Sequence, residues 1–125
     1  MVRGLTILKT EDKPGGLQVF NKAGEWVDVP IVPDCFIVNV GDLMARWTND
    51  TWVCTRHRVV NPSMAAADMS RRQSVVFFHN PNYDAVIECI PSCQGPTHPP
   101  KYPVTTSGEH LRSQFVRTQT QAGGA

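Results

Sequence analysis

Three side chains whose chemistry suits a metal ion and a carboxylate ligand stand in two nearby segments of the chain. His57 lies within residues 56–62, and Arg72 and Ser74 open the segment 72–78. Neutral imidazole binds iron or zinc, arginine binds a carboxylate through two parallel hydrogen bonds, and a serine hydroxyl can donate a further one. These residue types indicate a site for a metal ion together with a carboxylate-bearing ligand.

Both segments are predicted to be β-strands joined by a loop. Residues 59–60 and 75–78 are β-branched or aromatic, and a turn-forming Asn-Pro pair follows the first of these runs. Side chains alternate between the two faces of a strand, so Arg72 and Ser74 lie together on one face of theirs. If that face and the face of His57 both point inward, one pocket receives the imidazole, the guanidinium and the hydroxyl.

The elements that must position these residues are mostly short strands. Apolar runs separated by glycine, proline and asparagine turns occur at residues 5–8, 17–20, 26–29, 35–40 and 86–90. Leu43 and Trp47 have the spacing of one face of a short helix, and Thr106 and Glu109 have the spacing of a capping box for a helix over residues 111–117. This pattern predicts an all-β protein of the sandwich or jelly-roll class.

The chain of 125 residues suits one domain with a distinct tail. Residues 1–93 are predicted to form the domain core and residues 94–125 the tail. Residues 94–103 contain four prolines and a glycine, which indicates an extended arm before the short helix. Residues 119–125 are expected to be a flexible, disordered end.

Composition argues against several classes of partner. Twelve Lys and Arg against eleven Asp and Glu give a net charge of +1 without a basic run, so neither nucleic acid nor a membrane surface is an expected partner. No apolar run approaches membrane-spanning length. The four cysteines, in a chain without a charged-then-apolar leader, are expected to be reduced thiols. We therefore expect a cytoplasmic protein.

A series of motifs resembles the C-terminal half of the iron(II)/2-oxoglutarate-dependent dioxygenases of the isopenicillin-N-synthase-like superfamily. In the family's order, they are Gly15-Gly16-Leu17-Gln18-Val19, Asn39-Val40-Gly41-Asp42, His57-Arg58-Val59-Val60-Asn61-Pro62, Arg72-Gln73-Ser74 and Phe77-Phe78-His79-Asn80-Pro81-Asn82. The resemblance runs from about Leu5 into the C-terminal region. It implies a double-stranded β-helix, or jelly roll, that is truncated at its N-terminal side.

The resemblance also implies a role for each candidate residue. His57 corresponds to the distal iron ligand, and Arg72 and Ser74 correspond to the residues that bind the carboxylate of 2-oxoglutarate. The family's other two ligands form a His-x-Asp motif, whose aspartate would fall at about Met1. Both are therefore expected to be missing from this chain, together with the N-terminal half of the domain that would supply them in cis.

The implied function is that of the C-terminal part of an oxidoreductase. With Fe(II), 2-oxoglutarate as cosubstrate and O2, the complete enzyme would act on a small organic substrate by hydroxylation, desaturation or ring closure. Two alternatives are a non-catalytic dicarboxylate-binding module that kept Arg72 and Ser74, and an inactive gene fragment. In the fragment, loss of the early strands would expose sheet edges and core.

Structural roles are the alternative for single residues. His57 could be an ordinary hydrogen-bonded histidine, and Arg72 could pair with Asp68 or Glu88. The three remaining histidines are expected to be structural or exposed: His79, His98 and His110.

A zinc site with three cysteines and one histidine is a further alternative. Its ligands would be Cys54, His57, Cys89 and Cys93. The strand period disfavours it, because residues three apart on a strand face opposite ways.

Overall fold

The computed structural model describes residues 4–13, 16–61 and 72–122, and within these it forms two compact units. The strand unit comprises the described residues of 7–39 and 55–77. The helical unit comprises those of 4–6, 40–54 and 78–122. The predicted loop over residues 62–70 lies outside the described residues, and the predicted division between residues 93 and 94 stays a prediction.

Most of the described chain outside two helices is strand or turn, as the sequence predicts. The strands are β1 (Leu5–Thr10), β2 (Leu17–Phe20), β3 (Trp26–Asp28), β4 (Ile37–Val40), β5 (His57–Val59), β6 (Ser74–His79), β7 (Val86–Ile87) and β8 (Thr105–Thr106). The helices are α1 (Asp42–Trp47), the 3-10 turn η2 (Pro91–Cys93) and α2 (Ser107–Ala122). β7 is shorter than the run predicted at residues 86–90.

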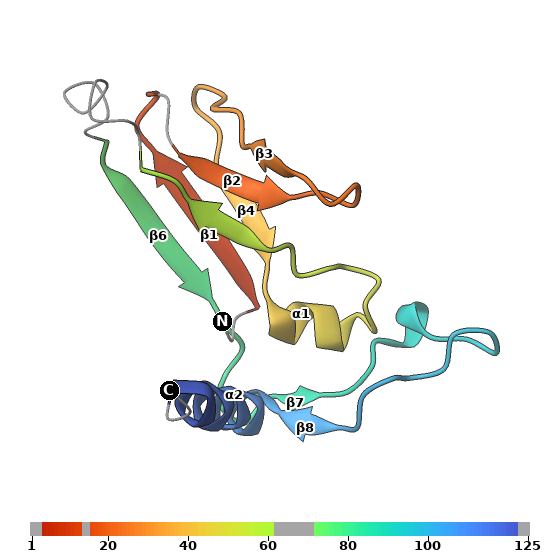
Figure 1. The fold of residues 1–125 in the computed structure, drawn as a ribbon. Helices are drawn as coiled ribbons and strands as arrows, with labels where there is room; N and C mark the ends of the chain where they lie inside the picture. Colours follow the sequence, from red (N-terminus) through yellow and green to blue (C-terminus); the bar gives the residue numbers. More distant parts are fainter. Residues whose placement is uncertain (1–3, 14–15, 62–71, 123–125) are drawn as a thin grey trace. The chain divides into compact units, whose positions relative to one another are not determined.

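Two three-stranded sheets carry the candidate residues. One has the order β4-β1-β6 and the other the order β3-β2-β5 (Figure 1). In the second sheet, β2 is antiparallel to both neighbours, with Val19 opposite His57 and Gln18 opposite Arg58. The register therefore fixes which face of the sheet each side chain of β5 occupies.

Gly16 permits the close approach of β5 to the start of β2. The Val60 N–H donates to the Gly16 carbonyl oxygen at 2.8 Å. A Cβ at position 16 would lie only 1.8 Å from the Val60 carbonyl oxygen. The predicted turn before residue 17 thus ends on a glycine because no larger residue fits beside the strand that carries His57.

The helical unit holds the buried apolar side chains of the described chain. Leu43 and Ile87 are each 1% exposed, and Ala45 is also buried. β7 and β8 pair antiparallel, with Ile87 opposite Thr105. No helix among the described residues is long and apolar enough to cross a membrane.

The capping box at the start of α2 is confirmed, but the helix is longer than predicted. The Glu109 N–H donates to Thr106 Oγ1 at 3.2 Å, and the Thr106 N–H donates to a Glu109 carboxylate oxygen at 3.3 Å. The helix starts at Ser107 and continues to Ala122, past the end predicted at residue 117. The flexible end expected over residues 119–125 stays a prediction. Arginine, glutamine and alanine favour helix, and no glycine interrupts the sequence between Gly108 and Gly123.

The proline-rich segment is fixed to the end of α1 by one buried side chain. Asn49 is fully buried and has a φ of 51°, a conformation that asparagine tolerates better than most residues. Its amide donates to the carbonyls of Cys93 and Pro99 at 3.2 and 3.1 Å. Its side-chain oxygen accepts the Lys101 N–H at 2.9 Å. The arm predicted over residues 94–103 is thus held at several points.

Candidate functional site

His57 lies on the apolar face of the β3-β2-β5 sheet. Because His57 is opposite Val19 and Val59 is opposite Leu17, these residues share one face, while Gln18 and its partners occupy the other. The side chain of His57 is exposed. An exposed imidazole in apolar surroundings is available to a ligand.

A backbone carbonyl holds the His57 ring and selects its tautomer. His57 Nδ1 lies 3.1 Å from the carbonyl oxygen of Thr55. A carbonyl can only accept, so Nδ1 carries the proton and donates it, and in the neutral ring Nε2 keeps its lone pair. Histidines that bind metals are oriented in this way, with one ring nitrogen bonded to the protein and the other directed to the metal.

Ser74 is the first residue of β6, and Arg72 lies two residues before it, with Gln73 between them. The Gln73 N–H donates to a carboxylate oxygen of Glu11 at 3.0 Å, and the Glu11 N–H donates to the Gln73 carbonyl at 3.1 Å. These bonds fix the strand register at its start. The shared face of Arg72 and Ser74 stays a prediction, because β6 begins at Ser74.

The charge of Arg72 is balanced only weakly by the described residues. The pKa of Glu11 lies below its ordinary value, chiefly because of the hydrogen bond from Gln73, with a smaller contribution from the charge of Arg72. No ion pair with Arg72 occurs within residues 4–13, 16–61 and 72–122. Of the two acids considered as partners, Glu88 belongs to the helical unit and Asp68 lies outside the described residues. The half-buried guanidinium remains available to an anionic ligand.

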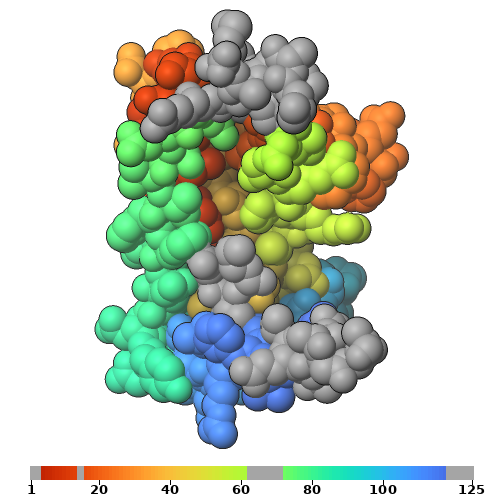
Figure 2. Space-filling model, turned by 60° about the vertical axis from the view of Figure 1, so that its left-hand side comes forward, coloured from red at the N-terminus to blue at the C-terminus, as the bar shows by residue number. Residues whose placement is uncertain are grey.

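The strands that carry the candidates flank a hollow of the strand unit. Figure 2 shows the first residues of β6, in green, on one side and β5, in yellow-green, on the other, with the earlier strands in red behind them. His57 belongs to one sheet and Ser74 to the other, and Arg72 lies two residues before β6. The strand placement is therefore compatible with one site between the two sheets of this unit.

A three-ligand metal site is not formed by the described residues. No group of three histidine, cysteine, aspartate or glutamate side chains gathers within the described part of the chain. The zinc alternative with Cys54, His57, Cys89 and Cys93 is therefore not observed. His57 alone suits one position of an iron site, but a lone imidazole does not fit the task of holding Fe(II) by itself.

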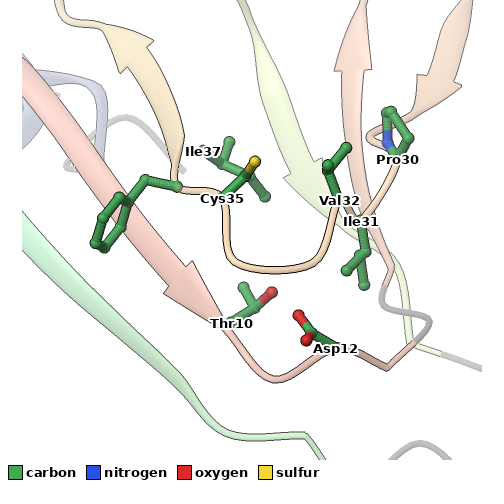
Figure 3. A pocket seen from close by; sticks show the side chains of 8 residues that line it. Thr10, Asp12, Pro30, Ile31, Val32, Cys35 and Ile37 are labelled. Atoms are coloured by element: carbon green, nitrogen blue, oxygen red, sulfur yellow. The ribbon is translucent and has the colours of Figure 1, made fainter.

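The structure has a small pocket at the C-terminal end of β1 that the sequence did not indicate. It encloses about 60 Å³ and is lined by Thr10, Asp12, Pro30, Ile31, Val32, Cys35, Phe36 and Ile37. Figure 3 shows Thr10 and Asp12 on one side and the loop with Val32 and Cys35 on the other. Ligand pockets usually have at least about 300 Å³, so this one is too small for an organic substrate.

Comparison with known proteins places these motifs in a family context. A family model described as "2OG-Fe(II) oxygenase superfamily" matches residues 2–81. The chain is 36% identical over 120 residues to the 2-oxoglutarate-Fe(II) type oxidoreductase hxnY of Emericella nidulans, and the alignment covers 95% of this chain and 33% of that protein. The chain thus spans about a third of the length of this relative.

Two solved structures share the fold. A 2OG-Fe(II) oxygenase family protein from Caulobacter crescentus superposes with a TM-score of 0.84 at 30% identity, covering 94% of this chain and 38% of that one. A full-length Neurospora crassa protein in complex with alpha-KG and thymine superposes with a TM-score of 0.81 at 35% identity, covering 93% and 35% of the two chains. The jelly-roll fold predicted from the sequence is confirmed by these likenesses.

Proposed function

The chain belongs to the 2OG-Fe(II) oxygenase superfamily, and we propose that it supplies the distal iron ligand and the 2-oxoglutarate anchor of an oxidoreductase of that family. The observation that carries the proposal is the hydrogen bond of His57 Nδ1 to Thr55 at 3.1 Å. It leaves Nε2 as the metal-binding atom without any change of tautomer. The similarity to an oxidoreductase does not favour the alternatives of a non-catalytic binding module or an inactive fragment.

Arg72 and Ser74 are proposed to bind the distal carboxylate of 2-oxoglutarate. The planar guanidinium can give two parallel hydrogen bonds to the two carboxylate oxygens, and the Ser74 hydroxyl can give another. The backbone bonds of Gln73 to Glu11 hold the strand between the two residues. The anchor is therefore placed by the sheet before the ligand arrives, which lowers the entropy cost of binding.

Iron and O2 are the other components of the proposed reaction. The structure of the Neurospora crassa protein contains alpha-KG and thymine, which makes a small organic molecule the class of substrate that we propose here. When bound, the iron would supply the oxidation chemistry, coupled to decarboxylation of 2-oxoglutarate. Residues of this chain would orient the cosubstrate and provide one ligand through His57 Nε2.

A chimeric enzyme tests this function. Residues 5–117 replace the aligned segment of the Neurospora crassa protein, whose remaining sequence supplies the other parts of the domain, and succinate formation from 2-oxoglutarate is measured with thymine. We expect the chimera to be active and His57→Gln to lower kcat at least about a hundredfold, because the iron loses a ligand. His79→Gln, at an exposed histidine of β6, is the matched control.

The same chimera tests the anchor. Arg72→Gln is expected to raise KM for 2-oxoglutarate about tenfold to a hundredfold, since a charged hydrogen-bond pair contributes about 1.5–3 kcal/mol. Arg112→Gln, at an exposed position of α2, should leave KM unchanged. A folded chimera that is inactive, or one that keeps full activity in His57→Gln, would refute the proposed function.

We also propose a cytoplasmic location, which rests on the state of the thiols. All four cysteines are free. Partial desolvation raises the pKa of the Cys54 and Cys89 thiols, and the nearby Asp42 and Cys93 charges add to the respective shifts. Protonated thiols react slowly with disulfides. Alkylation of all four cysteines in unreduced cell extract is expected, and a disulfide-linked species would contradict the proposal.

A further inference from the structure

The face of the β3-β2-β5 sheet opposite His57 carries two arginines stacked on aromatic rings. Arg58 Cζ lies 4.2 Å from the centroid of the Trp26 ring. Arg56 Cζ lies 5.1 Å from the Phe20 ring and 5.9 Å from the Trp26 ring. The centroids of the Phe20 and Trp26 rings lie 5.1 Å apart, and the angle between the ring planes is 58°. The two rings together form one aromatic surface. We call these four residues the arginine face.

Strand register places these residues on one face. Phe20 is opposite Trp26, and the Phe20 N–H donates to the Arg56 carbonyl at 2.9 Å, so Arg56 continues the same cross-strand row. Gln18 is opposite Arg58 in the next row of this face. Because His57 lies between the two arginines in sequence, its side chain points to the other face.

Both arginines lack a carboxylate partner in the part of the chain that the structure describes. Arg58 Nε donates to Gln18 Oε1 at 2.9 Å, and Gln18 Nε2 donates to Asp28 Oδ1 at 2.9 Å. The acid of this row therefore interacts with the amide rather than with the guanidinium. Neither arginine forms an ion pair with a described residue, and both are exposed.

The arrangement favours an anionic ligand of a particular shape. Stacking on a ring restricts the motion of each guanidinium, so less entropy is lost when it binds a carboxylate. Arg58 uses Nε for Gln18 and keeps both terminal nitrogens for a bidentate pair. Arg56 immediately precedes β5 and Arg58 lies within it, so the two arginines are two residues apart, about 6.6 Å along an extended chain. Carboxylates at alternate positions of an extended peptide have the same spacing.

We propose that the arginine face binds an extended acidic peptide segment of another protein. Alternate carboxylates of the peptide would bind Arg56 and Arg58, which lie over the rings of Phe20 and Trp26. Charge complementarity favours an acidic occupant. The positive charges of Arg56 and Arg58 lie close together and repel each other, and a bound carboxylate would relieve this repulsion. The face is distinct from the one that carries His57. A docked peptide therefore leaves the proposed iron ligand free.

Fluorescence anisotropy of a labelled peptide tests the docking. The peptide alternates glutamate with threonine, and its isomer has the same composition with the glutamates placed consecutively. The chain is expected to bind the alternating peptide more tightly than the isomer. The double variant Arg56→Gln with Arg58→Gln should weaken binding at least about tenfold. The double variant Arg112→Gln with Arg117→Gln, on α2, removes the same charge and should bind as the parent does.

Two further variants separate the proposed face from net charge and from misfolding. Arg58→Lys keeps the charge but loses the planar fork, and Trp26→Leu removes the ring beneath it; each should weaken binding about threefold to tenfold. Unchanged far-UV circular dichroism shows that a weakened variant is folded. Equal affinity for both peptides, unchanged affinity in the Arg56 and Arg58 double variant, or tighter binding to phosphatidylserine vesicles than to the peptide would overturn the proposal.

Discussion

The helical unit and the strand unit differ in what holds their residues in place. Leu43, Ile87 and Asn49, the largest fully buried side chains of the described chain, all lie in the helical unit. Every residue of β5 is exposed, and so is every residue of β6. The segments that carry the candidate chemistry are thus positioned mainly by backbone pairing, while side-chain burial is concentrated elsewhere. Local stability is expected to follow burial, so the strands with His57 and Ser74 should open most easily.

The largest expected effect on stability comes from removing the buried Asn49 amide of the helical unit. Asn49→Ala removes three hydrogen bonds to Cys93, Pro99 and Lys101 and puts alanine, which tolerates a positive φ less well than asparagine, at a φ of 51°. We expect a loss of about 4 kcal/mol in the free energy of unfolding, measured by urea denaturation. Asn49→Gly loses the same bonds without the backbone strain and should recover about 1 kcal/mol.

Hydrogen exchange by segment would show where that loss falls. Amides of α1 and β7 should lose protection in Asn49→Ala. Stability indistinguishable from the parent would contradict the role of Asn49 as the organising contact of the helical unit.

A smaller effect on stability is expected at Gly16, where β5 closely approaches the start of β2. Gly16→Ala places a Cβ against the Val60 carbonyl and should separate β5 from the start of β2. Overpacking of this kind costs about 1–3 kcal/mol. Gly95→Ala is the control, since a Cβ there meets no atom within 4 Å. Amide exchange of β5 should accelerate in Gly16→Ala alone, and identical exchange in both variants would show that the pairing does not depend on the glycine.

The smallest expected effect is pH-dependent and lies in the helical unit. Burial alone would raise the pKa of Asp50, but hydrogen bonds from Lys101 and Tyr102 outweigh it and hold the pKa below its ordinary 3.8. A carboxyl whose pKa is lowered by folding stabilises the protein above its unfolded pKa, and this contribution disappears as the pH falls through the folded pKa. Asp50→Asn should therefore destabilise the protein at neutral pH and have little effect in acid below the folded pKa.

Partial exposure of Asp50 limits the size of that effect. Its side chain is 35% exposed, so solvent screening reduces the contribution to about 1 kcal/mol at neutral pH. Urea denaturation of the variant and the parent across the acidic range measures the difference. Asp84→Asn, at an exposed aspartate of the same unit, is the control. A stability difference that persists unchanged in acid would show that charge is not the cause.

Sequence patterns predicted the features that depend on neighbouring residues. The apolar run at residues 17–20 became β2, and the paired capping residues Thr106 and Glu109 start α2. Motif order indicated the jelly roll, since His57, Arg72 and Ser74 occur in the family's context. These features follow from local propensity or from matched short motifs, both of which are visible in one chain.

Features that depend on contacts between distant residues were not visible in this way. Asn49 follows a predicted helix end, yet its bonds reach residues 44 to 52 positions away. The arginine face emerges only when register places Arg56 and Arg58 beside the ring of Trp26. Local patterns also missed the end of α2, because favourable helix formers continued past the predicted segment.

The most direct test of the proposed site is a 2-oxoglutarate titration of the chain followed by amide NMR. Saturable shifts should appear at Arg72, Gln73 and Ser74, with none at Lys101 and Tyr102 of the helical unit. Arg72→Gln should abolish these shifts and Arg112→Gln should preserve them. Shifts that persist in Arg72→Gln, or that are confined to the helical unit, would contradict the assignment of the 2-oxoglutarate anchor to the strand unit.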